Sequence, residues 1–364
     1  MVQGGSLLRN LDRAAEPFGL ATTAGNVSHT GVGGLTLGGG MGWLARQFGM
    51  ACDNVEAYTV VNADGETVRA SATENPDLFW ALRGGGGNFG IVTEFEFRLH
   101  PISGQVLVAM LFFDASDGAA ALRGWRELLP DAPRQATLAA DAVTAGQAPF
   151  LPSNLHGRSV VAVGFAWVGD MAEARRYLEA FRGRLIAPVA AEVREMTYVE
   201  LQSLFDDNDQ HGKRRYVKGH YLSELSDAAI DAFVGRGVPA GGPEPDWSRM
   251  PNGGFQAYGG AIAEFSDDES AFSQRGALVE FGAGTSWLDP AEDAARMSAA
   301  RTYAAAVEPF ASGVYVNALS DEGEAGVKRA YPPAKLARLA ELKRRYDPDN
   351  VFHLNQNIRP AIAG

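Results

Sequence analysis

The most informative part of the sequence is Gly25-Asn-Val-Ser-His-Thr-Gly-Val-Gly-Gly-Leu-Thr-Leu-Gly-Gly-Gly-Met-Gly42. Eight of its eighteen positions are glycine, and ordering a glycine on folding costs more conformational entropy than ordering any other residue. One explanation is that the backbone approaches a ligand, because bare N–H groups on glycine-rich chain form concave sites for anions such as a pyrophosphate. The other is a buried turn that lets neighbouring elements pack. The stretch alone leaves both open.

A second glycine run, Gly84-Gly-Gly-Gly-Asn-Phe-Gly90, contains the spacing GxGxxG. In Rossmann folds this fingerprint follows a strand and opens a helix. Here the order is reversed, because Asn75-Pro76 begins a short helix before the run and a strand pattern follows it. We therefore expect neither glycine run to open a helix, and we expect no Rossmann-type NAD site.

Composition excludes several classes of function. A chain of 364 residues with 46% hydrophobic residues can form two domains with proper cores. The net charge of −12 argues against a nucleic-acid-binding surface, which needs clustered Lys and Arg. The single cysteine, Cys52, excludes an intrachain disulfide and leaves no zinc-binding spacing, so we expect no metal.

The sequence also carries no sign of membrane insertion or export. No apolar run reaches the length of a membrane span, and the first ten residues lack the apolar core of a signal peptide. These features favour a cytoplasmic protein that does not bind membranes.

Residues 1–101 show the patterns of a mixed α and β unit. Helical spacing is expected over 7–17, 43–48 and 77–83, and strands over 55–61, 67–70 and 91–99. The turn signal Asn62-Ala-Asp-Gly65 joins the first two strands into a hairpin.

After Pro101 the pattern changes to alternating strands and helices. Strands are expected over 106–113, 136–144, 159–168 and 189–196, and helices over 116–129 and 170–182. This β-α-β-β-α-β order packs two helices on one face of an antiparallel sheet. Further strands are expected at 254–263 and 278–283, and further helices at 226–234 and 290–306.

Three motifs together resemble the berberine-bridge-enzyme-like flavin oxidases, in the bacterial branch that includes the hydroxynicotine oxidases. The first is Thr30-Gly-Val-Gly-Gly-Leu-Thr-Leu-Gly-Gly-Gly-Met-Gly-Trp-Leu44, followed by Cys52-Asp-Asn54. The second is Glu74-Asn-Pro-Asp-Leu-Phe-Trp-Ala-Leu-Arg-Gly-Gly-Gly-Gly-Asn-Phe-Gly-Ile-Val92. The third is Tyr346-Asp-Pro-Asp-Asn-Val-Phe-His-Leu-Asn-Gln-Asn-Ile358.

The resemblance implies an α+β fold. It consists of the second half of a PCMH-type FAD-binding domain and a substrate domain whose antiparallel sheet carries helices on one face. We expect the FAD-binding domain over 1–101, the substrate domain over 102–313, and a berberine-bridge-type C-terminal segment over 314–364 that returns to the first domain. Nothing in the chain corresponds to the family's N-terminal subdomain, which carries a glycine-rich loop and a flavin-binding histidine.

The resemblance also implies the residues that contact FAD, which lie in both glycine runs and in the C-terminal segment. These residues are Thr30, Gly31, Gly33, Gly34, Gly38, Gly39, Gly40, Asn54, Gly90, Ile91, Val92, Asn317, Asn355 and Asn357. Amide side chains suit this task because the flavin ring edge offers both donors and acceptors. Where some relatives attach the flavin to a cysteine this chain has Val27, so we expect FAD to be bound non-covalently and Cys52 to be a packing residue.

Two residues are candidates for catalysis. Tyr315 and Asn317 match the family's Tyr-x-Asn strand, and the alternation of a strand would place them on one face with Val314 and Val316 on the other. A tyrosine acts as a proton relay when a cation or hydrogen-bond donors lower its pKa. Glu264 is the second candidate, on an expected strand of the substrate domain.

The expected function is an FAD-dependent oxidase that transfers a hydride from an alcohol or amine carbon of a small organic substrate to flavin N5, with oxygen as acceptor. In this reaction the cofactor supplies the difficult chemistry and the protein supplies position, a base and exclusion of water. Two alternatives remain open. One is a non-catalytic flavin-fold protein, and the other is a protein that needs a separate N-terminal piece.

Overall fold

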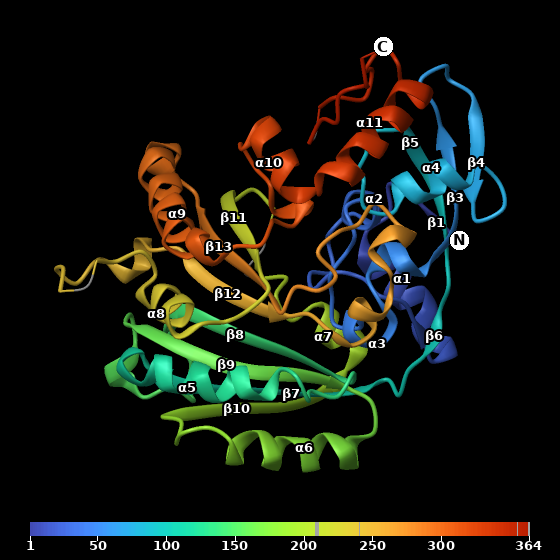
Figure 1. Cartoon of the computed structure of the whole chain (residues 1–364). Helices are drawn as coiled ribbons and strands as arrows, with labels where there is room; N and C mark the ends of the chain where they lie inside the picture. The colour runs from blue at the N-terminus through green and yellow to red at the C-terminus, as the bar shows by residue number, and fades with distance from the viewer. Residues whose placement is uncertain (208–210, 240, 355, 363–364) are drawn as a thin grey trace.

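Two antiparallel sheets organise the chain, and a hydrophobic core forms beside each of them (Figure 1). The computed structural model describes residues 1–207, 211–239, 241–354 and 356–362. Within these residues the small sheet has, in spatial order, β1 (Val2–Gln3), β5 (Ile91–Phe97), β3 (Val55–Val61) and β4 (Thr67–Ser71). The predicted hairpin of β3 and β4 is therefore confirmed. A separate pair joins β2 (Leu20–Ala21) to β6 (His100–Pro101).

The helices around the small sheet are short. They are α1 (Leu8–Ala15), α2 (Val32–Leu37), α3 (Ala45–Phe48) and α4 (Pro76–Leu82), with 3-10 turns at Glu16–Phe18 and Ala51–Asn54. The expectation that neither glycine run opens a helix is wrong for the first run, because α2 begins directly after Gly31. Three residues of α2 are buried, the apolar Val32 and Leu37 and the polar Thr36, and they anchor the helix despite its glycines.

The large sheet contains the four strands predicted from the β-α-β-β-α-β pattern and three more. Their spatial order is β10 (Ala190–Thr197), β7 (Gln105–Asp114), β9 (Ser159–Val168), β8 (Ala136–Thr144), β12 (Asn252–Ala257), β13 (Val279–Trp287) and β11 (Arg214–Leu222). The sequence patterns did not predict β11, which pairs with β13 along its whole length.

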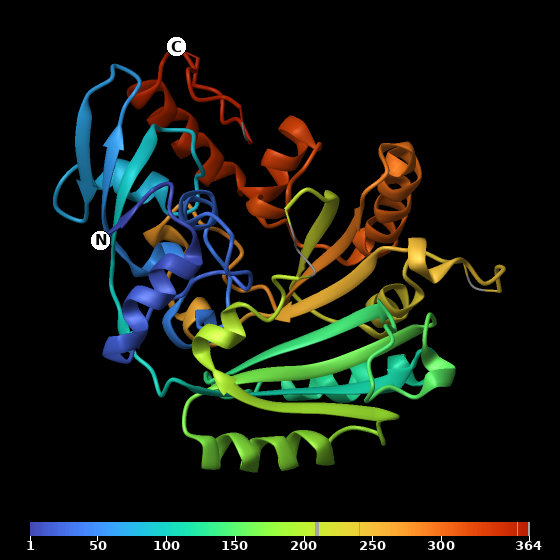
Figure 2. The same cartoon turned by 180° about the vertical axis from the view of Figure 1, so that it is seen from behind.

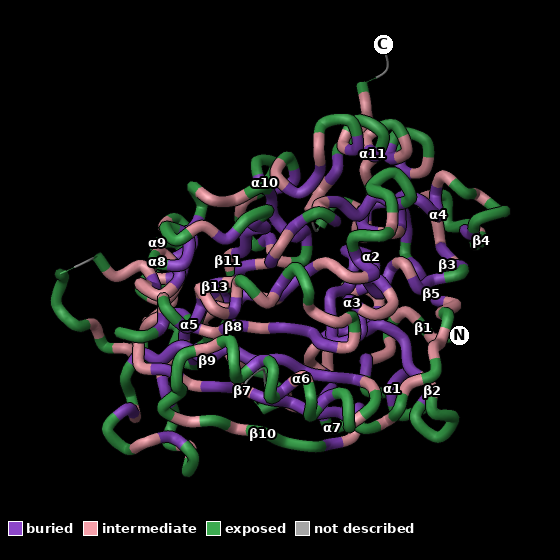
Figure 3. Tube along the Cα trace, turned by 60° about the horizontal axis from the view of Figure 1, so that its bottom comes forward, coloured by how far each residue is buried: buried purple, intermediate pink, exposed green. Residues whose placement is uncertain are grey.

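One face of the large sheet is covered by helices. They are α5 (Ala115–Leu128), α6 (Met171–Gly183), α8 (Asp227–Gly235) and α9 (Asp293–Val307), which share a core with the sheet. In Figure 2 the sheet lies in front of α5, so the opposite face is turned to the viewer. Figure 3 shows that β9 is buried while the edge strand β10 is largely exposed.

Side-chain alternation separates the two faces of this sheet. Leu138, Ala140 and Ala142 of β8 pack in the core under the helices, whereas Ala139 and Asp141 point to the other face. The strands β12 and β13 alternate in the same way. On their other face, β8, β12 and β13 therefore carry small, amide and acidic side chains.

The C-terminal segment packs against the part of the chain that contains the small sheet. Its helices are α10 (Gly323–Ala330) and α11 (Pro333–Tyr346), and Val314, Leu319 and Leu339 join the core that surrounds α4. The strand expected around Tyr315 is wrong, because this part forms a single bridge from Gly313 to Tyr221 and then a 3-10 turn over Val316–Ala318. The described helices include none that is long and apolar enough to cross a membrane.

The remaining short elements lie in the connections of the large sheet. They are α7 (Tyr198–Gln202) and 3-10 turns at Ser153–Leu155, Trp247–Arg249, Gly260–Glu264, Asp267–Glu269, Pro290–Glu292 and Glu308–Phe310. The strand expected over 254–263 is therefore shorter than predicted, and its second half is a turn.

Candidate active site

A cavity of about 910 Å³ lies between the glycine stretch, the start of β5 and the C-terminal segment. We call it the glycine cavity. Among the residues predicted to contact FAD, those that line it are Thr30, Gly33, Gly34, Gly90, Ile91, Val92 and Asn317. The sequence analysis missed Gly86, Gly87, Asn88, Ser320, Asp321 and Gln356, which line it as well. Its volume is at the upper end of the range for cofactor sites.

The glycines of this cavity leave room for a ligand. A Cβ added to Gly34 would meet no atom within 4 Å, so the backbone there is open to the cavity. Gly90 has a φ of +151°, and a Cβ there would lie 2.5 Å from Cγ1 of Val60, so only glycine fits at the cavity wall. Gly34 therefore matches the first explanation of the glycine stretch, close approach of backbone to a ligand, whereas Gly90, in the second run, is required by packing against Val60.

The polar groups of the glycine cavity also suit FAD. Asn317 donates its amide N–H to the carbonyl oxygen of Leu35 at 3.0 Å, which leaves its amide oxygen as an acceptor. Asp321 adds a carboxylate, the group that binds a ribose hydroxyl in dinucleotide sites, although here it is also paired with Lys218 and Arg301. The donor set therefore fits a cofactor with ribose, phosphate and an amide-rich ring edge.

The lining of the glycine cavity does not include Gly38, Gly39 or Gly40, which were also predicted to contact FAD. A Cβ on Gly39 would lie 2.7 Å from Phe272, and one on Gly40 would lie 2.4 Å from Ala51. The amide of Gly40 donates to the Tyr315 hydroxyl at 2.7 Å, so it is not free for a ligand. The second explanation of the stretch, packing, therefore holds for this part of it.

Three other predicted contacts also lie apart from the cavity lining. Gly31 is the residue before α2 and faces open space. Asn54 is buried, and its amide donates to the carbonyl oxygens of Phe48 and Met50 at 3.0 and 2.9 Å. Asn357 is absent from the lining, and the predicted contact of Asn355 falls on a residue outside those that the structure describes.

Tyr315 and Asn317 lie together, as predicted, although no strand holds them. Asn317 donates its amide to the Tyr315 hydroxyl oxygen at 2.9 Å, and the amide of Gly40 donates to the same oxygen. Burial nevertheless raises the pKa of Tyr315 above its ordinary value, and no Lys or Arg contacts its hydroxyl among the contacts of the described residues. Tyr315 therefore remains a neutral phenol whose oxygen is occupied by donors.

A second cavity, of about 550 Å³, lies on the face of the large sheet opposite α5, α6, α8 and α9. We call it the sheet cavity. Its walls are mostly apolar, with Trp43, Met110, Phe112 and Phe205 among them. Two carboxyl groups face it, Asp141 of β8 and Glu280 of β13, together with Asn26 and Gln256.

Both carboxyl groups have an unusual affinity for protons. Burial raises the pKa of Glu280 from 4.5 to about 7, although the hydrogen bond from Tyr258 opposes the shift. Burial alone raises the pKa of Asp141 from 3.8 to about 7. Titratable groups with such shifts in a cleft are candidates for a functional site. The signal in the sequence is a lone acid inside an apolar strand, as in Ala139-Ala-Asp-Ala-Val143.

A chain of side chains connects the two cavities. Tyr258 donates its hydroxyl proton to Oε2 of Glu280 at 3.0 Å, and the hydroxyl groups of Tyr258 and Tyr221 lie 3.1 Å apart. The ring of Tyr221 lies 6.3 Å from that of Tyr315, whose hydroxyl contacts Asn317 of the glycine cavity. These contacting side chains therefore connect the sheet cavity to the glycine cavity, and a movement of side chains at one cavity can be transmitted to the other.

Glu264 does not reach either cavity lining. It lies at the end of a 3-10 turn, its side chain is 55% exposed, and it pairs with Arg134. Lys218 is likewise engaged, because it pairs with Asp321 and with Glu322 at 2.6 Å. Glu264 therefore lines neither cavity, whereas Glu280 lines the sheet cavity.

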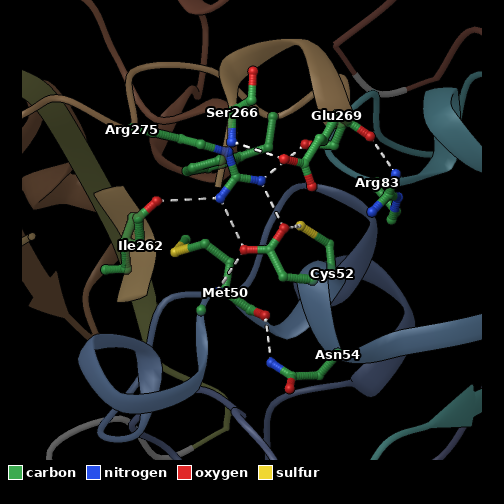
Figure 4. A network of polar contacts seen from close by, with 12 residues as sticks. Met50, Cys52, Asn54, Arg83, Ile262, Ser266, Glu269 and Arg275 are labelled. Atoms are coloured by element: carbon green, nitrogen blue, oxygen red, sulfur yellow. Dashed lines mark hydrogen bonds and ion pairs between the residues drawn. The ribbon is translucent and has the colours of Figure 1, made fainter. Parts of the chain in front are cut away.

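Cys52 lies in a buried polar network around Arg275 (Figure 4). Arg275 binds the carboxylate of Asp53 with contacts of 2.6 and 2.9 Å, and Cys52 lies 3.8 Å from the same carboxylate. Burial, with the adjacent Asp53, raises the pKa of the Cys52 thiol well above its ordinary value. A buried, protonated thiol is a packing residue, in agreement with the sequence analysis. The described residues include no cluster of side chains arranged to hold a metal ion.

Comparison with known proteins adds two family matches at the ends of the chain. Residues 1–71 match the model of the FAD binding domain, and residues 314–359 match the model named berberine and berberine like. These two ranges contain most of the residues that line the glycine cavity.

Individual relatives align along nearly the whole chain. An FAD-linked oxidoreductase of Dictyostelium discoideum is 30% identical over 99% of this chain and 75% of its own length. The (R)-6-hydroxynicotine oxidase of Paenarthrobacter nicotinovorans is 29% identical over 99% of this chain and 77% of its own.

Solved structures share the fold. The glucooligosaccharide oxidase of Acremonium strictum superposes with a TM-score of 0.85 at 22% identity, over 100% of this chain and 78% of that one. The berberine-bridge-like protein 1 of Physcomitrella patens gives a TM-score of 0.83 at 24% identity, over the same shares of both chains. The predicted α+β, PCMH-type fold is therefore confirmed.

Proposed function

Because the chain belongs to the berberine-bridge-like family of FAD-linked oxidoreductases, we propose that it oxidises an alcohol or amine carbon of a small organic substrate, with oxygen as acceptor. The glycine cavity holds FAD, through Gly33, Gly34, Asn317 and the backbone of 90–92. The sheet cavity holds the substrate. When bound, FAD supplies the two-electron acceptor for the hydride that leaves the substrate carbon.

One observation carries this proposal, the placement of Glu280 in the sheet cavity. Its carboxyl group faces the cavity, and Tyr258 fixes its orientation by a hydrogen bond of 3.0 Å. A general base works best when its pKa lies near the operating pH, and burial raises the pKa of Glu280 to about 7. Glu280 takes the proton from the hydroxyl or ammonium group of the substrate as the carbon is oxidised.

The other side chains position the reactants. Tyr315 is proposed as a positioning residue, since its hydroxyl accepts from Asn317 and from the backbone of Gly40. The apolar walls of the sheet cavity exclude water from the substrate. FAD is bound non-covalently in this proposal, because Val27 offers no attachment and Cys52 is buried with a raised pKa.

The test is a substrate screen with the FAD-loaded protein. Hydrogen peroxide is measured after addition of arylalkyl amines, arylalkyl alcohols and small sugars, and the best substrate is then given to Glu280→Gln. Loss of a general base lowers rates by roughly 10²–10⁴-fold, so the variant should fall in this range with unchanged FAD content.

The control is Glu264→Gln, which removes an exposed, ion-paired carboxylate and should leave the rate unchanged. A rate within threefold of the wild type for Glu280→Gln would refute the assignment of the base. No peroxide and no bleaching of the flavin with any compound would refute oxidase activity towards these classes.

A further inference from the structure

Asp141 has an environment that the proposed reaction does not explain. Its carboxyl group faces the sheet cavity, and it makes no side-chain hydrogen bond or ion pair in the contacts of the described residues. Burying an unpaired carboxylate is costly, so proteins normally pair or hydrogen-bond such groups. Glu280, the other carboxyl group of the cavity, has Tyr258 as partner.

The floor between the two carboxyl groups is made of glycine. Asp141 lies opposite Gly254 on β12, and Gly254 lies opposite Gly282 on β13, so the three positions form one row across the sheet. A Cβ on Gly282 would meet no atom within 4 Å, and one on Gly254 would meet only Oδ1 of Asp141 at 3.3 Å. Because the two glycines carry no side chain, the row forms an open groove in the surface of the sheet, which we call the trough, and the Asp141 carboxyl group lies at one end of it.

Glu280 lies on the same face, two residues from Gly282 along β13. Two strand spacings and two residue rises place the Cα atoms of Asp141 and Glu280 about 12 Å apart. Glu280 is the nearer of the two to the glycine stretch, because its partner Tyr258 connects it to Tyr221 and Tyr315. Asp141 therefore lies at the far end of the trough from the proposed reacting carbon.

Within the part of the chain that the structure describes, no positively charged side chain pairs with Asp141. The other charged residues of the cavity lining are Glu192 and Arg194 on β10, which pair with each other at 3.8 Å. The strands β7, β9 and β8 separate β10 from Gly254 and Gly282, and they contribute apolar side chains such as Val108 and Ala162 to the lining. The positive charge that would pair with the Asp141 carboxylate must therefore come from a bound ligand.

We propose that Asp141 binds a cationic ammonium group at the distal end of the substrate, whose apolar body lies along the Gly254 and Gly282 trough. The inference rests on the proposed function, which it narrows to amphipathic organic cations. Asp141 is a specificity residue in this account, and Glu280 remains the base.

The test measures binding rather than turnover. Phenylbutylamine and its neutral counterpart phenylbutanol are titrated calorimetrically into the FAD-loaded protein at pH 8, where both carboxyl groups are mostly ionised. The wild type should bind the amine at least tenfold more tightly than the alcohol, because hydrogen bonds to charged groups are stronger than those to neutral groups. Asp141→Asn should remove this preference and leave the affinity for the alcohol within twofold.

Two further variants make the test independent of folding defects. Asp141→Glu keeps the negative charge and should keep the preference for the amine. Gly282→Val fills the trough with a side chain and should lower the affinity for both the amine and the alcohol. Glu264→Gln, with its exposed carboxylate, should behave as the wild type.

A measurement on the unaltered site completes the design. Burial raises the pKa of Asp141 to about 7, so at pH 7 a fraction of the protein carries a protonated Asp141. A bound cation favours the carboxylate and should therefore cause the release of protons to the solvent. Calorimetric titrations in buffers of different ionisation enthalpy measure this proton release. Fewer protons should be released per bound amine in Asp141→Asn than in the wild type.

Equal affinity of the wild type for the amine and the alcohol, or an unchanged preference in Asp141→Asn, would overturn the inference. Failure of the proposed function is seen separately, as tight and selective amine binding without any oxidation.

Discussion

The amide oxygen of Asn317 stands 1.9 Å from the point that a Cβ of residue 38 would occupy, so the C-terminal segment can dock there only against Gly38. Two segments far apart in the sequence thereby meet at one wall of the glycine cavity, whose lining includes Asn317. The clash distance is too short for any small adjustment, since real Cβ atoms essentially never approach another heavy atom so closely.

Gly38→Ala should therefore displace Asn317 and weaken FAD binding. We expect at least a tenfold loss of FAD affinity in a flavin fluorescence titration, with a loss of about 1–3 kcal/mol in the free energy of unfolding from overpacking. Gly31→Ala is the matched control, because its new methyl group would face open space. FAD affinity in Gly38→Ala equal to that of the control would show that Asn317 does not matter for the cofactor.

The buried pair of Arg275 and Asp53 should be important for stability. Their side chains are 3% and 0% exposed, so Arg275→Met leaves an uncompensated carboxylate in the protein interior. Removing one partner of a buried pair costs about 3–5 kcal/mol of unfolding free energy, which urea denaturation measures.

The control for this pair is Arg345→Met. Arg345 pairs with Asp77 but its side chain is 65% exposed, so its removal should cost less than about 1 kcal/mol. Equal losses of unfolding free energy in the two variants would mean that the burial of Arg275 does not determine how much it contributes to stability.

The rate of substrate oxidation should rise with pH through about 7. Burial holds the pKa of Glu280 at about 7 instead of 4.5, and only the deprotonated carboxylate accepts a proton. In Glu280→Gln the residual rate should lose this rise, whereas Glu264→Gln should keep it. A wild-type profile that is flat between pH 5 and pH 9 would exclude Glu280 as the base.

Acid precipitation should release all bound flavin into the supernatant. Val27 has no nucleophilic atom, and the Cys52 thiol is buried and its pKa is raised well above the ordinary value, so neither forms a flavin bond. Absorbance of the supernatant and the pellet measures the division. Yellow colour that stays with the pellet would mean that another side chain, with His29 the first to examine, attaches the cofactor.

The sheets could be predicted from the sequence because their strands either alternate in hydrophobicity, as β5 does, or form short continuous apolar runs, as β7 and β9 do. The β3–β4 hairpin and the first four strands of the large sheet follow their predicted ranges closely. The short helix α2 could not be predicted, because glycines within it hide the helical pattern that tertiary packing enforces. The sequence places Tyr315 and Asn317 side by side on a strand, whereas in the structure a 3-10 turn brings them together.

The site was harder to predict than the fold. The glycine stretch serves two purposes, and only three-dimensional neighbours such as Phe272 and Ala51 distinguish the packing glycines from those of the cavity. Glu280 and Asp141 come to face one cavity through the pairing of β8 with β12, which are more than a hundred residues apart in the sequence, and of β12 with β13, and no local pattern encodes this. A lone acid in an apolar strand was the signal available for both.

The account depends most on FAD occupying the glycine cavity, and Gly34→Val tests this most directly. Gly33 is less suitable, because a Cβ there would lie 2.9 Å from the carbonyl oxygen of Gly4 and would disturb the fold itself. At Gly34 the added side chain meets only open space and fills the cavity. Gly183→Val is the control, since residue 183 also faces open space but lies at the end of α6.

The decisive measurement is the FAD affinity of these three proteins by fluorescence titration. We predict that wild type and Gly183→Val bind FAD alike and that Gly34→Val, with an unchanged circular dichroism spectrum, binds none. FAD binding by Gly34→Val at wild-type affinity would contradict the account.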